Sequence, residues 1–201
     1  MASSPRLALL PDVSMTSPLP HSSHEVVIRL MTADDLPAVL AIQARCYHAD
    51  LHESAATFAA KLRHSGDTCW VACDGADRLL AYLFAQPAAY MHPPRLNSAP
   101  GENAAAARKP NTGADLVLHL HDLAVDRTAR GLALGDRLVA QAFAAARTAG
   151  LTRLSLVAVQ QSSAFWGRFG FTAPDRPLPP GLAEELASYG DDACYRVAPA
   201  I

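Results

Sequence analysis

The chain has 201 residues, of which 50% are hydrophobic, and its formal net charge is -2 at pH 7. This length suits one domain with a full core and is too short for two domains of ordinary size. The near-neutral charge argues against a nucleic-acid-binding protein, and no apolar run approaches the roughly 20 residues that a membrane-spanning helix needs.

Residues 1–24 are predicted to form a flexible tail, because prolines and serines are mixed there without hydrophobic periodicity. The apolar run Leu7–Leu10 is shorter than the core of a secretory signal peptide, which needs about 7 apolar residues. The rest of the chain, 25–201, is predicted to be a single domain. The cysteines form no CxxC pair and are expected to be free thiols of a cytoplasmic protein. They lie at positions 46, 69, 73 and 194.

Hydrophobic periodicity predicts a strand, two helices and two further strands in the first part of the domain. Thr32 and the acidic residues after it mark the start of the first helix. A turn at Gly75 and Ala76 joins the two later strands into a hairpin. The expected ranges are a strand at 25–31, helices at 32–47 and 54–64, and strands at 68–74 and 78–86.

A long irregular loop is predicted between residues 87 and 114, where prolines argue against a continuous helix or strand. Loops of this length are usually functional or disordered. Regular structure then resumes, and the overall order predicts a mixed α/β sheet. The expected ranges are a strand at 115–125, a helix at 134–148, a strand at 151–159, a short helix at 162–170 and a final strand at 191–199.

The segment RTARGLALGDRL, residues 127–138, joins a predicted strand to a predicted helix. Its small residues let the backbone approach a ligand, and the N–H groups of a helix N-terminus favour an anion such as a pyrophosphate. Spacing alone favours an ordinary strand-to-helix turn. The segment is neither a P-loop nor a Rossmann fingerprint, because it lacks GxxxxGK[ST] and Ala133 breaks GxGxxG.

Two segments together carry a family resemblance. LAVDRTARGLALGDRLV (residues 123–139), followed by SSAFWGRFGF (162–171), resembles the GNAT N-acetyltransferases, whose signature is Arg/Gln-x-x-Gly-x-Gly/Ala at a helix start. Arg130, Ala133 and Gly135 stand at the signature positions. HLHDLAV (119–125) is closer still to the arylalkylamine N-acetyltransferases. The resemblance implies a GNAT-like α/β (α+β) fold, with a mixed and mostly antiparallel central sheet flanked by helices.

The same resemblance implies acetyl-CoA as co-substrate and no metal. The backbone at 123–125 would pair with the pantetheine arm, and the amides at 130–135 would hold the pyrophosphate. Ala133 replaces the usual glycine, at a cost of roughly 1–2 kcal/mol if its φ is positive. Trp166 stands where many members place a tyrosine that protonates the leaving thiolate. The implied cofactor-binding residues are Leu123, Ala124, Val125, Arg130, Gly131, Leu132, Ala133, Leu134, Gly135, Phe165 and Trp166.

His119 and His121 are the candidate catalytic residues. Residues two apart on a strand share a face, so both are expected to look into one cleft. An imidazole pKa of about 6.5 suits removal of a proton from an amine, and the matching pair in arylalkylamine enzymes is implicated in a water-linked relay. The alternatives are half-buried structural histidines or a metal site, although no further cluster with ligand spacing supports a metal.

The expected acceptor is a small-molecule or peptide amine. The resemblance places the region between the first two helices at the acceptor site, which makes Tyr47 and Glu53 candidate substrate-binding residues. An exposed helix-capping role is the alternative for Glu53. The loop at 87–114 is expected to shape the pocket. Tyr195 is a candidate substitute acid, although a packed sheet tyrosine is the favoured interpretation.

The sequence therefore predicts an N-acetyltransferase that moves an acetyl group from acetyl-CoA to an amine by direct attack in a ternary complex. One alternative is transfer of another acyl group, or transfer to a hydroxyl. Another is a non-catalytic module that binds or senses acyl-CoA. The sequence leaves the oligomeric state open, and a homodimer is one alternative, because edge strands in this fold often pair across dimers.

Overall fold

The computed structural model describes residues 25–100 and 116–201. The predicted tail at 1–24 and the second half of the predicted loop at 87–114 lie outside these residues. The described residues build one six-stranded sheet in the order β1-β2-β3-β4-β5-β6. Neighbouring strands are antiparallel except β4 and β5, which are parallel, so the expected mixed and mostly antiparallel sheet is confirmed. The strands are β1 (Val27–Leu30), β2 (Cys69–Cys73), β3 (Leu79–Ala89), β4 (Leu116–Val125), β5 (Arg153–Ala158) and β6 (Cys194–Pro199).

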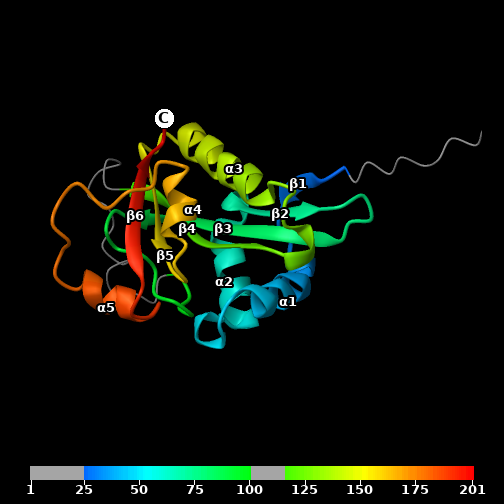
Figure 1. Ribbon diagram of the computed structural model, residues 1–201, viewed down its shortest axis with the longest axis horizontal. Coiled ribbons are helices and arrows are strands. Elements are labelled where there is room, and N and C mark those ends of the chain that lie inside the picture. The colour runs from blue at the N-terminus through cyan, green and yellow to red at the C-terminus, as the bar shows by residue number, and fades with distance from the viewer. Residues whose placement is uncertain (1–24, 101–115) are drawn as a thin grey trace, which may run out of the picture.

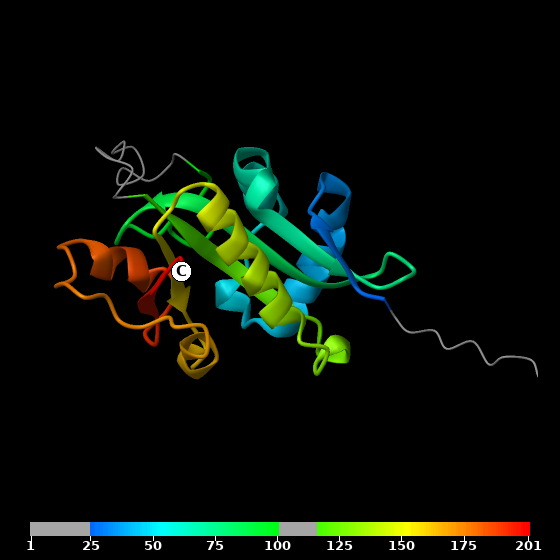
Figure 2. The same ribbon diagram turned by 90° about the horizontal axis from the view of Figure 1, so that it is seen from above.

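Helices cover both faces of the sheet (Figure 1). On one face, Val39 and Ile42 of α1 pack with Phe58 of α2 against β2 and β3. On the other face, Leu134 and Leu138 of α3 pack against the middle strands, and Figure 2 shows α3 lying across them. In the described parts of the chain, no helix is long and apolar enough to cross a membrane. The helices are α1 (Leu36–Cys46), α2 (Ala55–Ser65), α3 (Leu134–Thr148), α4 (Ser163–Gly167) and α5 (Leu182–Ala187).

Two elements differ from the sequence prediction. β3 continues to Ala89, through Pro87, which was expected to begin the loop. The proline is tolerated because β2 pairs with β3 only as far as Phe84, so β3 has a single neighbouring strand at this point. α5 was not predicted, because six residues after a proline-rich stretch are too few to establish a helical period.

A β-bulge in β4 decides which side chains reach the site. Phe84 pairs with Asp122 but Ala85 pairs with Leu120, so His121 is the extra residue. After the bulge, Leu123 packs on the α3 side of the sheet, whereas Ala124 packs on the side of α1 and α2. His121 and Asp122, although adjacent in sequence, therefore both point toward α1 and α2.

β4 and β5 pair over three residues only. The pairs run from Leu118 with Leu154 to Leu120 with Leu156. Beyond Leu120, the edge of β4 that faces β5 has no strand partner among the described residues. A cavity opens at this point, lined by β4 residues 120–125 and by Val157 of β5.

Candidate active site

The cavity has a volume of about 280 Å³. Its walls come from β4, from the end of α1, from the segment between β5 and α4, and from Tyr189 after α5. Several of the residues predicted from sequence line it, namely Tyr47, Glu53, His121, Leu123, Ala124, Val125, Arg130, Phe165 and Trp166. The lining does not include His119, nor the loop residues Gly131, Leu132, Ala133, Leu134 and Gly135.

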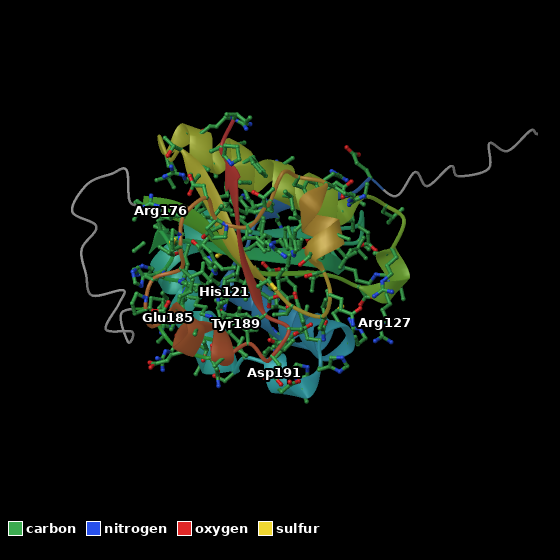
Figure 3. The ribbon with its side chains drawn as sticks, turned by 60° about the vertical axis from the view of Figure 1, so that its left-hand side comes forward. His121, Arg127, Arg176, Glu185, Tyr189 and Asp191 are labelled. Atoms are coloured by element: carbon green, nitrogen blue, oxygen red, sulfur yellow. The ribbon has the colours of Figure 1, made fainter. Side chains whose placement is uncertain are left out.

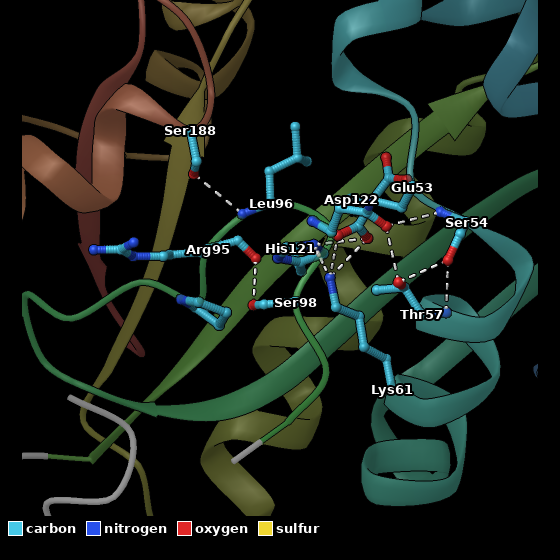
Figure 4. Close-up of polar contacts among 12 residues, drawn as sticks. Glu53, Ser54, Thr57, Lys61, Arg95, Leu96, Ser98, His121, Asp122 and Ser188 are labelled. Atoms are coloured by element: carbon cyan, nitrogen blue, oxygen red, sulfur yellow. Dashed lines mark hydrogen bonds and ion pairs between the residues drawn. The ribbon is translucent and has the colours of Figure 1, made fainter. Parts of the chain in front are cut away.

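His121 is held by polar groups from three other segments of the chain, two of which, those of Glu53 and Lys61, are seen in Figure 4. Its Nε2 contacts the ammonium of Lys61 on α2 and lies 3.0 Å from Oε2 of Glu53. Its Nδ1 lies 3.4 Å from the hydroxyl of Tyr189, which donates a hydrogen bond to the carbonyl of Pro94 at 2.5 Å. Figure 3 shows His121 and Tyr189 near each other at the centre of the molecule. The imidazole is thus fixed in position while it lines the cavity.

Glu53 and Lys61 form a buried ion pair beside His121. The Nζ of Lys61 donates to both carboxylate oxygens, at 2.6 and 2.7 Å, and Oε1 also accepts from the N–H of Asn97 at 2.5 Å. Burial by itself raises the pKa of Glu53, but the interactions with His121 and Lys61 outweigh it and lower that pKa to about 2. Burial lowers the pKa of Lys61, against the effect of Glu53.

The burial of Glu53 corrects one expectation from the sequence. Glu53 is only 4% exposed, and the residue that caps α2 is Ser54, whose hydroxyl accepts from the N–H of Thr57 at 3.1 Å. The alternative of an exposed capping role for Glu53 is therefore wrong. Gln43 on α1 fixes the backbone here, because its side-chain amide bonds both the N–H and the carbonyl of Glu53.

His119 lies behind His121. The two ring centroids are 6.0 Å apart, as expected for neighbours on one face of a strand, but His119 is 1% exposed. Its Nδ1 lies 3.0 Å from Oγ of Ser155, and its Nε2 has no hydrogen-bond partner among the described residues. Burial lowers the pKa of His119 well below its ordinary value, with smaller contributions from His121 and Lys61. His119 is therefore a neutral, enclosed histidine.

Asp122 brings a second carboxyl to the cavity wall. Its Oδ2 accepts from the hydroxyl of Tyr82 at 2.8 Å, while Oδ1 has no hydrogen-bond partner within the described ranges. Burial raises the pKa of Asp122, although the hydroxyls of Tyr47 and Tyr82 oppose this. Tyr47 itself donates to the carbonyl of Leu123 at 2.7 Å.

The β4 edge next to the cavity is contacted by side chains of the α1 end. Besides Tyr47 on the Leu123 carbonyl, Sγ of Cys46 donates to the carbonyl of Val125 at 3.3 Å. Burial raises the pKa of Cys46, so its thiol stays protonated at neutral pH. Each carbonyl has a second lone pair, so this edge can still accept a hydrogen bond from an extended ligand.

The start of α3 offers backbone N–H groups without partners in the helix, as every helix N-terminus does. Ala133 precedes it with φ 53° and ψ 28°, a left-handed conformation, so the expected steric cost of an alanine here applies. Arg127 and Arg130 are exposed beside it. Arg137, a third arginine of the segment, donates to the carbonyl of Val26 at 2.8 Å.

The close packing of α3 against Phe165 explains why residue 135 is a glycine. A Cβ at this position would lie 3.3 Å from the ring of Phe165 and 3.8 Å from Val125. Glycine therefore lets α3 and α4 approach each other beside the cavity. Trp166 packs edge-on against Phe165, with centroids 4.9 Å apart, and against Phe171 at 5.6 Å.

A second cavity adjoins the first and shares Leu51, Gln160 and Tyr189 with it. Its other lining residues include three carboxylates and no lysine or arginine. The carboxylates are those of Asp50, Asp191 and Asp192. The charges at the described site are therefore separated, with Arg130 in the first cavity and the three carboxylates in the second.

Three residues of the site were missed in the sequence. Lys61 carried a signal, because it follows Phe58 by three positions and falls on the buried stripe of α2, where a lysine is unusual. Asp122 could be assigned to the cavity wall only with knowledge of the bulge in β4, which the sequence does not show. Tyr189 follows a helix that the sequence did not reveal, and it gave no local signal.

Residues 36–171 match the acetyltransferase (GNAT) family. The chain belongs to the GNAT family. A search of curated proteins finds no match. Three solved structures show that the fold is shared, at sequence identities of 21% and below.

One similar structure is GphF, a GNAT-like decarboxylase in complex with isobutyryl-CoA, with 21% identity and a TM-score of 0.62 over 87% of this chain and 100% of that chain. Another is the polyamine N-acetyltransferase of Drosophila melanogaster, with 19% identity and a TM-score of 0.61 over 87% and 100%. A third is YhbS of Escherichia coli in complex with CoA, with 18% identity and a TM-score of 0.54 over 92% and 85%.

Within this GNAT chain, the tyrosine considered as a substitute acid is structural. The hydroxyl of Tyr195 accepts from the N–H of Met91 at 3.0 Å, and Tyr195 does not line the cavity. It is packed with Tyr90, Val117 and Leu182. The favoured interpretation of Tyr195 as a packed sheet residue is therefore confirmed.

Proposed function

We propose that this chain is an N-acetyltransferase that moves an acetyl group from acetyl-CoA to a small-molecule or peptide amine, by direct attack in a ternary complex. The observation that carries the proposal is that His121, fixed by Glu53 and Lys61, lines the cavity beside the open edge of β4. Similar structures bound to CoA and to isobutyryl-CoA, and the similar polyamine N-acetyltransferase, support the choice of both substrates.

The residues at the start of α3 fit the pyrophosphate of CoA. The free N–H groups of the first turn and the exposed Arg127 and Arg130 favour an anion. Asp136 also lies in this turn, but it forms an ion pair with Arg168 at 2.8 Å. The pantetheine arm would then follow the β4 edge from Leu123 to Val125.

His121 would take the proton that the acceptor amine must lose. An alkylamine is almost wholly protonated at neutral pH, because its pKa is close to the value of about 10.4 for lysine. An imidazole in the cavity removes the proton, and the amine nitrogen then forms a C–N bond to the acetyl carbon. The C–S bond breaks and CoA leaves as a thiolate, and the second proton that the attacking nitrogen must lose passes to this thiolate through water. We assign the first proton transfer to His121 and a supporting role to His119, because burial keeps His119 neutral.

The charge at the cavity mouth favours a cationic acceptor. The carboxylates of Asp50, Asp191 and Asp192 line the adjoining cavity, through which an acceptor would enter, so their field attracts an ammonium group. Glu53 is a weaker candidate for this purpose than the sequence indicated, because Lys61 already neutralises it.

Release of CoA thiol tests the proposal. Purified protein with acetyl-CoA is offered arylalkylamines, polyamines, amino acids and aminoglycosides, each at two ionic strengths. We expect amine-dependent thiol release that weakens at high salt, and its loss in His121→Gln. Binding of acetyl-CoA with no thiol release for any amine would favour the non-catalytic binding module instead.

A further inference from the structure

We propose that Lys61 is a positioning residue of this site, whose ammonium neutralises Glu53 and so keeps His121 unprotonated and ready to accept the proton of the acceptor amine. This inference rests on the proposed function, because it assigns Lys61 a part in the same proton transfer. Lys61 lies at the centre of the hydrogen-bonded cluster in Figure 4.

The burial of Lys61 calls for an explanation. Lysine is almost never fully buried unless it is paired, and Lys61 is 1% exposed. A buried ion pair is a weak source of stability, because the desolvation of both ions offsets their attraction. An apolar pair of similar volume would fill this space between α2 and β4 without that penalty. The position of Lys61 against His121 points to a role in the chemistry of the cavity.

The contacts of His121 with Tyr189 and Lys61 fit an imidazole that carries its hydrogen on Nδ1. Tyr189 donates its hydroxyl hydrogen to the Pro94 carbonyl, so its oxygen is left to accept from Nδ1–H of His121. Nε2 then carries the lone pair and accepts from the ammonium of Lys61. Lys61 has two further N–H groups, which the two oxygens of Glu53 accept.

The charges that face His121 explain why Lys61 matters. Glu53 is a carboxylate 3.0 Å from Nε2, and by itself it would favour the imidazolium. The ammonium of Lys61 contacts the same Nε2 and supplies the opposite charge. His119 and Tyr189 also face the ring, and burial keeps both neutral, while burial raises the pKa of the neighbouring Asp122.

The ion pair of Glu53 and Lys61 can also accommodate His121 after it has accepted the proton. The proton leaves the ammonium nitrogen of the acceptor and ends on Nε2 of His121, where it replaces the hydrogen bond from Lys61. Oε2 of Glu53 is already 3.0 Å from Nε2 and can accept the new N–H, while Oε1 keeps its bond to Lys61 at 2.6 Å. One carboxylate then bridges two cations, so the extra charge is stabilised during the reaction and released afterwards.

Proton titration of His121 by NMR tests the inference on the free protein, with the resonance assigned from its absence in His121→Gln. In Lys61→Met, the unbalanced Glu53 should raise the His121 pKa by about 1 to 3, in the range typical for one close charge. In the double variant Glu53→Gln with Lys61→Met, which removes both charges, the pKa should return close to the wild-type value. The acidic limb of the pH profile of kcat/KM should shift together with the His121 pKa in each variant.

Glu53→Gln alone covers the case in which Lys61→Met does not fold. It leaves Lys61 unbalanced and should lower the His121 pKa, with the double variant again restoring it. A His121 pKa that stays the same in every folded variant would overturn the inference. If the titrations shift as expected and no amine releases thiol, the charge coupling stands and the proposed function fails.

Discussion

The rings of His119 and His121 lie 6.0 Å apart on one face of β4, yet His121 lines the cavity and His119 does not. Substitution of the two histidines, one at a time, should therefore lower kcat/KM to different extents. His121→Gln should lower kcat/KM by about 10²- to 10⁴-fold, the usual worth of general base catalysis, and leave acetyl-CoA affinity unchanged. His119→Gln should lower kcat/KM far less, since its Nδ1 contacts Ser155 rather than the cavity. Steady-state kinetics with the best amine would contradict the assignment if the two losses were equal.

Arg130→Glu should weaken acetyl-CoA binding by more than tenfold, which corresponds to about 1.4 kcal/mol. Arg130 is exposed at the cavity wall beside the start of α3, where a reversed charge would repel the phosphates. Arg63→Glu, on the exposed face of α2, makes the same change in net charge and should have little effect. Calorimetry at two salt concentrations would measure both. Equal weakening by the two variants would mean that only net charge matters.

Ala133→Gly should stabilise the protein by up to roughly 1–2 kcal/mol, because the left-handed backbone at φ 53° penalises a Cβ. Ala140→Gly, at an exposed position inside α3, should instead destabilise it by about 1 kcal/mol. Urea unfolding of the two variants beside the wild type makes the comparison. If both variants lost stability alike, the left-handed conformation of Ala133 would be in doubt.

Trp166→Phe should keep most of kcat, because the ring still packs against Phe165 and Phe171 and an indole N–H does not act as an acid. Trp166→Ala should cost about 3–5 kcal/mol of stability and lose acetyl-CoA or acceptor affinity, because it opens a gap in this aromatic cluster. Turnover, thermal unfolding and binding are measured for both. Loss of turnover in Trp166→Phe with normal binding would give the indole a direct catalytic role.

The buried Glu53 carboxylate should make stability fall at acid pH. Its pKa is about 2 in the folded protein against an ordinary value of 4.5, so its contribution is complete above pH 4.5 and is lost as the pH falls through about 2. Glu53→Gln should flatten this part of the stability curve, whereas Glu25→Gln at an exposed position should not. Urea unfolding between pH 5 and 2 provides the curves. Parallel curves for wild type and Glu53→Gln would show that the carboxylate is not stabilised by folding.

The sequence by itself determined the order of the strands and the longer helices along the chain. It also determined that His119 and His121 share a face of one strand, and that a turn precedes α3. These features follow from local rules, since a period of two or 3.6 residues and the small residues of 130–135 act over short stretches of chain. The resemblance carried by 119–139 and 162–171 added the family, and the match over 36–171 confirms it.

The tertiary structure alone decided which groups surround His121. Lys61 is 60 residues and Tyr189 68 residues from His121 along the chain, and no local pattern specifies such pairings. The bulge that turns Asp122 toward the cavity depends on the register between β3 and β4. The cavity itself exists because β4 and β5 pair over three residues and then separate, which is a property of the assembled sheet and not of either strand.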